Sequence, residues 1–274
     1  MKSARKYGAA CIDYSNLFMA EARNREPASE QIKGHLRNLP LVYPLGKWIY
    51  RRFRGSDPTI QQQILKAVGS KPSVFFVQVG SNDGVQGDPI HDLIVERESW
   101  RGIFIEPIDF LFQRLRRNYG EAERFIFENV AIGTEKGSKK FYYVSEKART
   151  ELDLPYWHDQ LGSFDKAHII KALGEQMMPY IVEEEIECLP LQAVLDRNGV
   201  EAIDLIHIDT EGFDYKVLSQ LDLRRYKPSV ILFEHHLLPD DEFVKARKLL
   251  RGAGYRLLQY GNDILAIRKA SWTG

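Results

Sequence analysis

Short apolar runs alternate with amphipathic stretches along the chain from Val74 onwards. Runs such as 103–105 and 230–233 are apolar throughout, which is typical of central parallel strands covered on both faces. Strands and helices that alternate in this way predict right-handed βαβ units. The predicted strands are 74–79, 102–106, 125–130, 141–144, 186–189, 203–208, 230–234, 255–260 and 264–268, and the predicted helices are 89–98, 108–118, 191–198, 214–220 and 240–252.

The last two predicted strands meet at Gly261-Asn262, a turn sequence typical of a β-hairpin. A closing antiparallel hairpin distinguishes this α/β pattern from a plain dinucleotide-binding domain. It is the C-terminal signature of the seven-stranded, Rossmann-like sheet of class I methyltransferases. We therefore predict an α/β domain of this class over residues 71–274. Residues 146–185 have helical pieces but no strong strand, and we expect them to form an insertion over the acceptor side of the cleft.

Residues 1–70 are expected to form a helical, basic extension, in which Asp57-Pro58 begin a helix that runs to about Val68. The first 55 residues carry eleven Lys or Arg and four Asp or Glu, although the net charge of the chain is zero. Such an arm is suited to contact with an acidic partner or, peripherally, with a membrane surface. A solvated helical extension is the alternative. Because the net charge of the whole chain is zero, we do not expect a nucleic-acid partner.

The cysteine content and the apolar runs narrow the choice of compartment. Cys11 and Cys188 are the only cysteines and lie far apart, which argues against a disulfide framework and for a reducing compartment. The charged N-terminus does not resemble a signal peptide, and no run of ~18 apolar residues predicts a membrane span. We expect a cytoplasmic protein, with peripheral membrane contact as an open alternative.

The first predicted strand ends in a glycine-bearing loop, and the second ends in a carboxylate. Gly80 permits a tight turn, and Glu106 follows roughly 20 to 30 residues later, the spacing at which a carboxylate binds ribose hydroxyls. The loop 80–84 is not G-x-G-x-x-G, and the next helix begins only at Asp88-Pro89. An acidic N-cap there would repel a pyrophosphate. S-adenosylmethionine, which has a ribose and an amino-acid tail but no phosphate, fits better.

These segments resemble the FkbM family of S-adenosylmethionine-dependent O-methyltransferases. The resemblance spans about Val74 to Arg268, and its most specific element is the Asp-x-Glu-Gly at 209–212. It implies a class I fold and methyl transfer to a hydroxyl of a sugar, a glycan or a related natural product. The matching segments are FVQVGSNDG (76–84), FIEP (104–107), ENVAIG (128–133), DLIHIDTEGFD (204–214) and ILFEHH (231–236).

The expected cofactor residues follow the first three strands. Gln78 stands where many methyltransferases have an acidic residue, and we expect its side-chain oxygen to reach the methionine amine. Glu106 is expected to bind the ribose and Asn129 to contact the adenine. The full set is Gln78, Gly80, Ser81, Asn82, Glu106, Pro107, Asn129 and Ala131.

The expected catalytic residues are Asp209, Glu211 and His235. Asp209 should lie at the carboxyl end of a central strand, where open α/β sheets bind ligands. His235 follows the neighbouring strand and is expected to take the proton of the acceptor hydroxyl. With Glu234, this group has donors suited to a divalent metal such as magnesium, although its spacing does not require one. The expected acceptor-binding residues are His158, Ser163 and His236.

Asp214 should cap the helix that follows it, and His207, inside a strand, should be a core histidine. A module that binds S-adenosylmethionine or a partner without turnover stays open, and Gln78 favours it. An NAD-dependent oxidoreductase is also possible from Glu106, but the late helix and the terminal hairpin count against it. The acceptor and the oligomeric state stay open.

Overall fold

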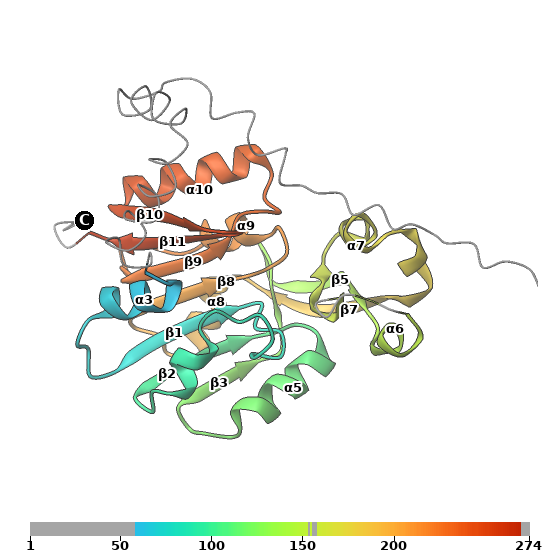
Figure 1. Ribbon diagram of the computed structural model, residues 1–274, viewed down its shortest axis with the longest axis horizontal. Helices are drawn as coiled ribbons and strands as arrows, with labels where there is room; N and C mark the ends of the chain where they lie inside the picture. The colour runs from blue at the N-terminus through green and yellow to red at the C-terminus, as the bar shows by residue number, and fades with distance from the viewer. Residues whose placement is uncertain (1–57, 153, 155–157, 270–274) are drawn as a thin grey trace, which may run out of the picture. The chain divides into compact units, whose positions relative to one another are not determined.

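The computed structural model describes residues 58–152, 154 and 158–269. Its central element is a seven-stranded sheet (Figure 1). Its strand order is β3-β2-β1-β8-β9-β11-β10. β11 pairs antiparallel with both β9 and β10, whereas the other neighbouring strands pair in parallel, so the predicted class I sheet with its C-terminal hairpin is confirmed. The strands are β1 (Val74–Val79), β2 (Trp100–Ile105), β3 (Phe125–Glu128), β8 (Leu205–Ile208), β9 (Val230–Glu234), β10 (Tyr255–Tyr260) and β11 (Asp263–Arg268).

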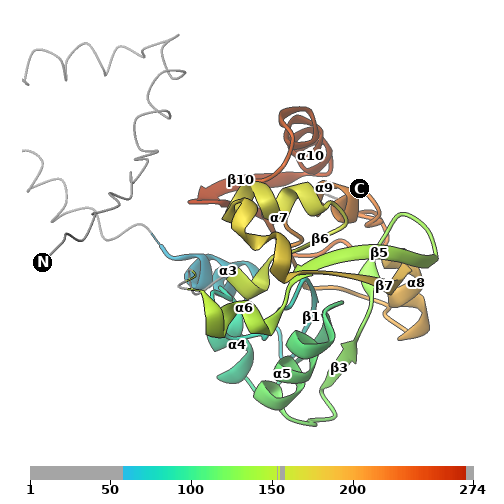
Figure 2. The ribbon, with the colours of Figure 1, turned by 90° about the vertical axis from the view of Figure 1, so that its right-hand side faces the viewer.

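Helices cover both faces of this sheet. On one face, Phe76 of β1 packs in a core with α3 (Ile60–Val68), α4 (His91–Val95) and α5 (Asp109–Tyr119). On the other face, Val77 packs in a core with α8 (Leu191–Arg197), α9 (Asp214–Leu218) and α10 (Asp240–Gly252). Figure 2 shows α4 and α5 on one side of β1 and α8 on the other. The alternation of side chains along a strand thus divides β1 between two hydrophobic cores.

Helix α3 begins with a capping box. Thr59 Oγ1 accepts a hydrogen bond from the amide of Gln62 at 3.2 Å, and Gln62 Oε1 accepts one from the amide of Thr59 at 3.1 Å. Thr59, rather than the expected Asp57-Pro58, is therefore the N-cap. The chain divides into 1–57 and 58–274, and the expected basic arm lies outside the described residues. The predicted boundary at residue 70 assigns α3 to the extension, whereas Ile64 and Val68 pack in the core of the sheet.

A second sheet of order β4-β7-β5-β6 lies beside the main sheet (Figure 1). Residues 158–180, which we call the cover segment, lie between α6 and β7 in the sequence and contain η2, β6, α7 and η3. The segment has a small core of its own around Ile169 and Met177. The elements are β4 (Ala131–Ile132), β5 (Gly137–Val144), α6 (Glu146–Glu151), η2 (His158–Gln160), β6 (Gly162–Ser163), α7 (Lys166–Leu173), η3 (Glu175–Tyr180) and β7 (Ile181–Leu189).

Strand β7 corrects the prediction in this region. Residues 186–189 do not continue the main sheet but form the end of β7, which begins inside the stretch expected to lack a strong strand. The three successive glutamates at 183–185 hide this strand from sequence-based prediction, because glutamate is uncommon in strands. Side chains of β5 contact these glutamates across the sheet: Lys140 forms an ion pair with Glu183 at 2.5 Å, and Tyr143 donates a hydrogen bond to Glu184 at 2.7 Å.

Candidate active site

A cavity of about 310 Å³ opens at the carboxyl ends of β1, β2 and β8, the edge where open α/β sheets bind ligands. The main-sheet side contributes Gly80, Asn82, Glu106, Pro107, Ile108, Val130, Asp209, Thr210, Glu211 and Lys216 among others. The second sheet and the cover segment contribute Ala131, Ile132, Phe141, Gln160, Gly162, Ser163, Phe164, Asp165 and His168. The cavity therefore joins the predicted cofactor loop to the predicted acceptor side.

Gly80 joins the ends of three strands at the floor of the cavity. Its amide donates to the carbonyl of Ile105 at 3.0 Å, and the amide of Asp209 donates to the carbonyl of Val79 at 2.9 Å. Gly80 has a φ of 76°, and a Cβ atom there would lie 1.7 Å from the carbonyl oxygen of Asp209. Glycine is therefore required for the close approach of two backbone segments as well as for the turn.

Glu106 is fixed at the end of β2 with 2% of its surface exposed. Its Oε2 accepts a hydrogen bond from the amide of Asn82 at 2.8 Å, and its Oε1 accepts one from the amide of Ile108 at 2.9 Å. Burial raises the pKa of Glu106 to about 7, although the two amide hydrogen bonds oppose this shift. Each carboxylate oxygen retains a lone pair, so the side chain can accept two further hydrogen bonds from a ligand in the cavity.

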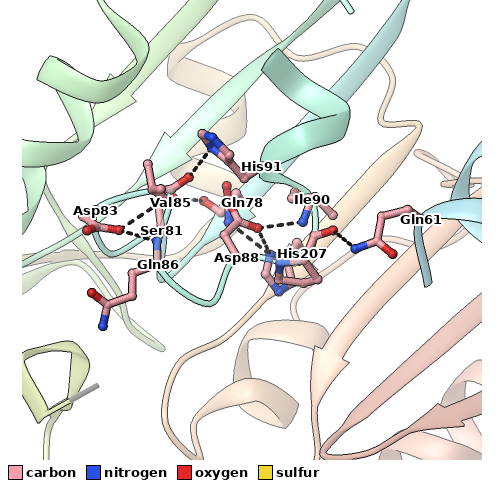
Figure 3. A network of polar contacts seen from close by, with 12 residues as sticks. Gln61, Gln78, Ser81, Asp83, Val85, Gln86, Asp88, Ile90, His91 and His207 are labelled. Carbon is pink, nitrogen blue, oxygen red and sulfur yellow. Dashed lines mark hydrogen bonds and ion pairs between the residues drawn. The ribbon is translucent and has the colours of Figure 1, made fainter. Parts of the chain in front are cut away.

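Gln78 does not line the cavity, contrary to expectation. It shares the strand face of Phe76, so its side chain is buried beneath the loop that follows β1 (Figure 3). Its Nε2 lies 3.1 Å from Nδ1 of His207, which lies 3.9 Å from Oδ1 of Asp88. Burial raises the pKa of Asp88 to about 6 and lowers that of His207 to about 4. His207 is thus the core histidine that was predicted.

Two other expected cofactor residues support the site from outside the cavity. Ser81 Oγ donates to the carbonyl of Gln78 at 3.2 Å and accepts from the amide of Ile105 at 3.1 Å. Asn129 Nδ2 donates to the carbonyl of Glu106 at 2.9 Å. Both side chains fix the backbone around Glu106, and neither lines the cavity, so Asn129 does not face the space expected for adenine. Gly80, Asn82, Glu106, Pro107 and Ala131 do line it.

The loop after β8 brings Asp209 and Glu211 to the cavity. Burial, and then the charge of Glu211, raises the pKa of Asp209 well above its usual range. Glu211 has a φ of 52°, an uncommon value for a residue with a side chain. Asp214 accepts hydrogen bonds from Thr210 Oγ1 at 3.1 Å and from the amide of Gly212 at 3.3 Å. Asp214 therefore braces this loop, instead of capping α9 as expected.

His235 lies outside the cavity. Its ring stacks on Phe243 of α10 with centroids 4.8 Å apart, and its amide donates to the carbonyl of Asn262 at 2.9 Å. Burial lowers the pKa of His235. The expectation that this imidazole faces the cleft is therefore wrong, because packing against α10 determines its direction. His236 is exposed and also lies outside the cavity.

The cover segment places one of its two expected acceptor residues at the cavity. Ser163 lines the wall, and its Oγ accepts a hydrogen bond from the amide of Asp165 at 3.1 Å. His158 is buried in η2 with 3% of its surface exposed, and it does not line the cavity. Both residues were predicted from their polar side chains alone, a signal that does not report which way a side chain points.

Sequence reasoning missed three side chains at the acceptor side. The rings of Phe164 and Phe213 lie 5.2 Å apart, and His168 Nε2 lies 3.6 Å from Glu211 Oε2. The spacing of Ile169 and Leu173, both buried, identifies the inner face of α7 and could have drawn attention to the adjacent histidine. Its partner on the main sheet could not be deduced from local sequence.

The expected carboxylate and histidine group has donors suited to a divalent metal. Within residues 58–269 as described, no three His, Cys, Asp or Glu side chains are arranged to hold a metal ion. His235 faces α10, so it does not join Asp209 and Glu211 at the cavity.

None of the helices in the described residues has the length and apolar character needed to cross a bilayer.

Several solved structures are similar to this chain. The methyltransferase FkbM from Methylobacillus flagellatus KT is 17% identical, with a TM-score of 0.45 over 72% of this chain and 44% of that protein. The precorrin-6y C5,15-methyltransferase from Geobacter metallireducens GS-15 is 12% identical, with a TM-score of 0.38 over 78% of this chain and 92% of that protein. This chain thus spans less than half the length of the first protein.

The sequence itself provides the family assignment. No curated protein matches the chain. The sequence model of the methyltransferase FkbM domain matches residues 78–257, more than half of the chain, and this range includes Glu106 and Asp209 at the cavity. The chain belongs to the FkbM methyltransferase family.

Proposed function

We propose that this protein transfers a methyl group from S-adenosylmethionine to a hydroxyl of a sugar, a glycan or a related natural product. The observation that carries the proposal is the buried carboxylate of Glu106, which two backbone amides hold at the cavity floor beside Gly80. A carboxylate so placed has lone pairs for the two hydroxyls of a ribose. The family supplies the reaction class, and the cavity supplies the residues that would perform it.

The cavity residues fit S-adenosylmethionine better than a dinucleotide. Ile108, Val130 and Ile132 offer an apolar wall near Glu106 for an adenine ring. Glu211 places a carboxylate at the neighbouring edge, which would repel a pyrophosphate and attract a cation. When bound, S-adenosylmethionine supplies an activated methyl group on a positively charged sulfur.

The acceptor would occupy the side formed with the cover segment. Phe164 and Phe213 provide apolar surface, while Ser163 and Asp165 lie in the same wall with polar groups. Such a mixture suits a molecule with both hydroxyl groups and apolar ring faces. Asp209 would orient the acceptor hydroxyl, and positioning of this kind accounts for a large part of the rate in group transfer.

The two other functions have less support. Gln78 was the feature that favoured a module without turnover, but its side chain serves a buried network and leaves the cavity to other residues. The oxidoreductase alternative requires a pyrophosphate beside the carboxylate of Glu211, which is electrostatically unfavourable. Neither alternative uses the aromatic and polar groups of the cover segment.

The proposal extends to the location of the protein. We propose a cytoplasmic enzyme whose basic residues 1–55 contact a membrane surface or an acidic partner. These residues lie outside the described part of the chain, so charge alone supports this point. Removal of residues 1–55 should abolish binding to anionic vesicles and leave cofactor affinity unchanged. Retained vesicle binding would contradict the membrane contact.

The decisive experiment is calorimetric titration with S-adenosylmethionine and, separately, with NADH. We expect the wild type to bind only S-adenosylmethionine and Glu106→Ala to lose that binding. Asp109→Ala is the matched control, because it removes an exposed carboxylate three positions further along the chain. Binding of NADH alone, or unchanged affinity in Glu106→Ala, would refute the proposal. Asp209→Asn should then bind cofactor but lose turnover in a screen of hydroxylated glycans with labelled methyl donor.

A further inference from the structure

We propose that His168 is the base that accepts the proton of the acceptor hydroxyl, and that Glu211 assists it as a positioning residue. This inference rests on the proposed function, since it assigns a role in the same methyl transfer. It replaces His235, whose ring packs against Phe243 and does not line the cavity. His168 comes from the cover segment, whereas Glu211 comes from the main sheet.

The local structure of α7 places His168 at the cavity. Asp165 caps the helix by accepting a hydrogen bond from the amide of Ala167 at 2.9 Å. Ile169 and Leu173 are buried in the core of the cover segment and fix the rotation of the helix. His168, next to Ile169, is therefore held in the cavity wall with 20% of its side chain exposed.

The opposite wall presents Glu211 through an unusual backbone conformation. Glu211 and Gly212 have φ values of 52° and 92°, and the buried carboxylate of Asp214 accepts a hydrogen bond from the amide of Gly212 at 3.3 Å. Residues other than glycine that adopt the left-handed backbone conformation concentrate at functional sites, where the surrounding structure enforces that conformation. Here the enforced turn directs Glu211 toward the cover segment, with 19% of its side chain exposed.

The distance between the two side chains suits an ion pair between a protonated imidazole and the carboxylate. His168 Nε2 and Glu211 Oε2 are 3.6 Å apart, beyond the range of a hydrogen bond but within the range of an ion pair. Nε2 is buried and has no hydrogen-bond partner in the structure, so in the tautomer that carries its proton on Nδ1 the lone pair of Nε2 can accept a proton. Once protonated, the imidazolium would be stabilised by the carboxylate of Glu211.

Asp209 is less suited to the role of base. Burial raises its pKa well above the usual range, and the nearby carboxylates of Glu211 and Asp214 raise it further. Burial and the neighbouring carboxylates thus favour the protonated form of Asp209, in which the carboxyl group donates a hydrogen bond instead of accepting a proton. Histidine changes its charge near neutral pH and commonly serves as a general base.

The acceptor oxygen forms a bond to the methyl carbon, while the bond between that carbon and sulfur breaks and leaves its electron pair on sulfur. The hydroxyl proton moves to Nε2 of His168. The products are the methyl ether, the neutral thioether and an imidazolium paired with Glu211. Release of the proton to solvent restores the neutral imidazole.

A cysteine trap tests the position of His168 without a known acceptor. His168→Cys is incubated with methyl-labelled S-adenosylmethionine, and peptide mass spectrometry locates the label. A thiol near the bound methyl donor should be methylated about tenfold or more above the control Lys171→Cys, which lies on the exposed side of α7. Equal labelling of the two variants, or no label at residue 168 while the cofactor binds, would overturn the placement.

A second experiment tests the role of the imidazole, with glycerol at high concentration as a simple hydroxyl probe. His168→Gln should lower methyl transfer to glycerol about 100-fold or more and leave calorimetric affinity for S-adenosylhomocysteine within about twofold of wild type. Glu211→Gln should lower kcat without raising KM for glycerol, and Glu211→Asp should restore part of the loss. A wild-type rate in His168→Gln, or a wild type that binds cofactor but transfers no methyl to glycerol, would overturn the assignment. Failure of the wild type to bind cofactor would instead refute the proposed function.

Discussion

A Cβ atom on Gly80 would lie 1.7 Å from the carbonyl oxygen of Asp209, so the loop after β1 and the end of β8 meet through backbone atoms. This contact couples the two halves of the candidate site. Glu106 is held by the amide of Asn82 in the first loop, and Glu211 lies two residues after Asp209 in the second. A displacement at Gly80 should therefore disturb both groups.

Gly80→Ala should destabilise the protein and abolish cofactor binding. The new methyl group would collide with backbone, and the φ of 76° would also be strained, at a combined cost of about 3 kcal/mol or more. Urea denaturation and calorimetry measure the two effects. Gly199→Ala is the matched control, because Gly199 has a φ of 62° but no atom near its added Cβ. Equal losses of stability in the two variants would show that the collision has no importance.

Cofactor affinity should depend on pH through Glu106, whose pKa burial raises to about 7. Ribose hydroxyls donate to the ionised carboxylate, so binding is strongest above this pKa and weakens as pH falls through it. Affinity should decline by up to about tenfold per pH unit below 7. Calorimetry from mildly acid to mildly alkaline pH measures the slope. Glu106→Gln should bind weakly with a flat profile, and a flat profile in the wild type would contradict the assignment.

Much of the main sheet could be predicted from sequence, because its strands are apolar and its turns carry glycine or asparagine. Runs such as 103–105 are unambiguous, and Gly261-Asn262 marks the terminal hairpin. Strand β7 could not be predicted, since the glutamates at 183–185 conceal it. Its stability depends on pairing with β5, including the contact of Lys140 with Glu183, which only the folded chain brings together.

The candidate site likewise has residues that could be predicted from sequence and residues that could not. Glu106 and Asp209 were predictable, because residues at the carboxyl ends of parallel strands share one edge whatever their side chains do. His235 was predicted by the same rule, but its direction depends on stacking with Phe243 of α10. His168 was missed because its pairing with Glu211 joins two segments distant in sequence. Position along a strand was predictable, whereas side-chain direction and partners required tertiary structure.

Glu234 should make the protein less stable as pH rises. Burial, and then the charges of Asp209, Glu211 and Asp263, raise its pKa to about 9. Because the folded state binds the proton more tightly than the unfolded state, stability is full at acid pH and is lost as pH rises toward 9. Glu234→Gln should therefore stabilise the protein at pH 8 by on the order of 1 kcal/mol.

Urea denaturation at several pH values checks this expectation. The variant should lose less stability than the wild type between about pH 6 and 9. Glu121→Gln is the control, since Glu121 is exposed and its replacement should leave the profile unchanged. A wild-type profile in Glu234→Gln would mean that other buried carboxyl groups, such as Asp88 and Glu106, dominate the pH dependence.

Gln78→Glu introduces the acidic residue that many methyltransferases have at this position, yet it should not improve cofactor binding. The side chain at 78 lies beneath the loop, where Gln78 Nε2 contacts His207 Nδ1 at 3.1 Å and Asp88 is also buried (Figure 3). A carboxylate there would lose the amide donor and lie near a second carboxyl group. We expect a loss of about 1–3 kcal/mol in the free energy of unfolding, with no gain in affinity.

The double variant Gln78→Glu with Asp88→Asn isolates the cause of this loss. If repulsion between the two carboxyl groups is responsible, the double variant should recover a large part of the stability, because an amide at 88 can donate to the new carboxylate. Urea denaturation of the wild type, both single variants and the double variant gives the coupling free energy between positions 78 and 88. Additive losses would contradict a direct contact, and a rise in cofactor affinity in Gln78→Glu would mean that this side chain reaches the cavity after all.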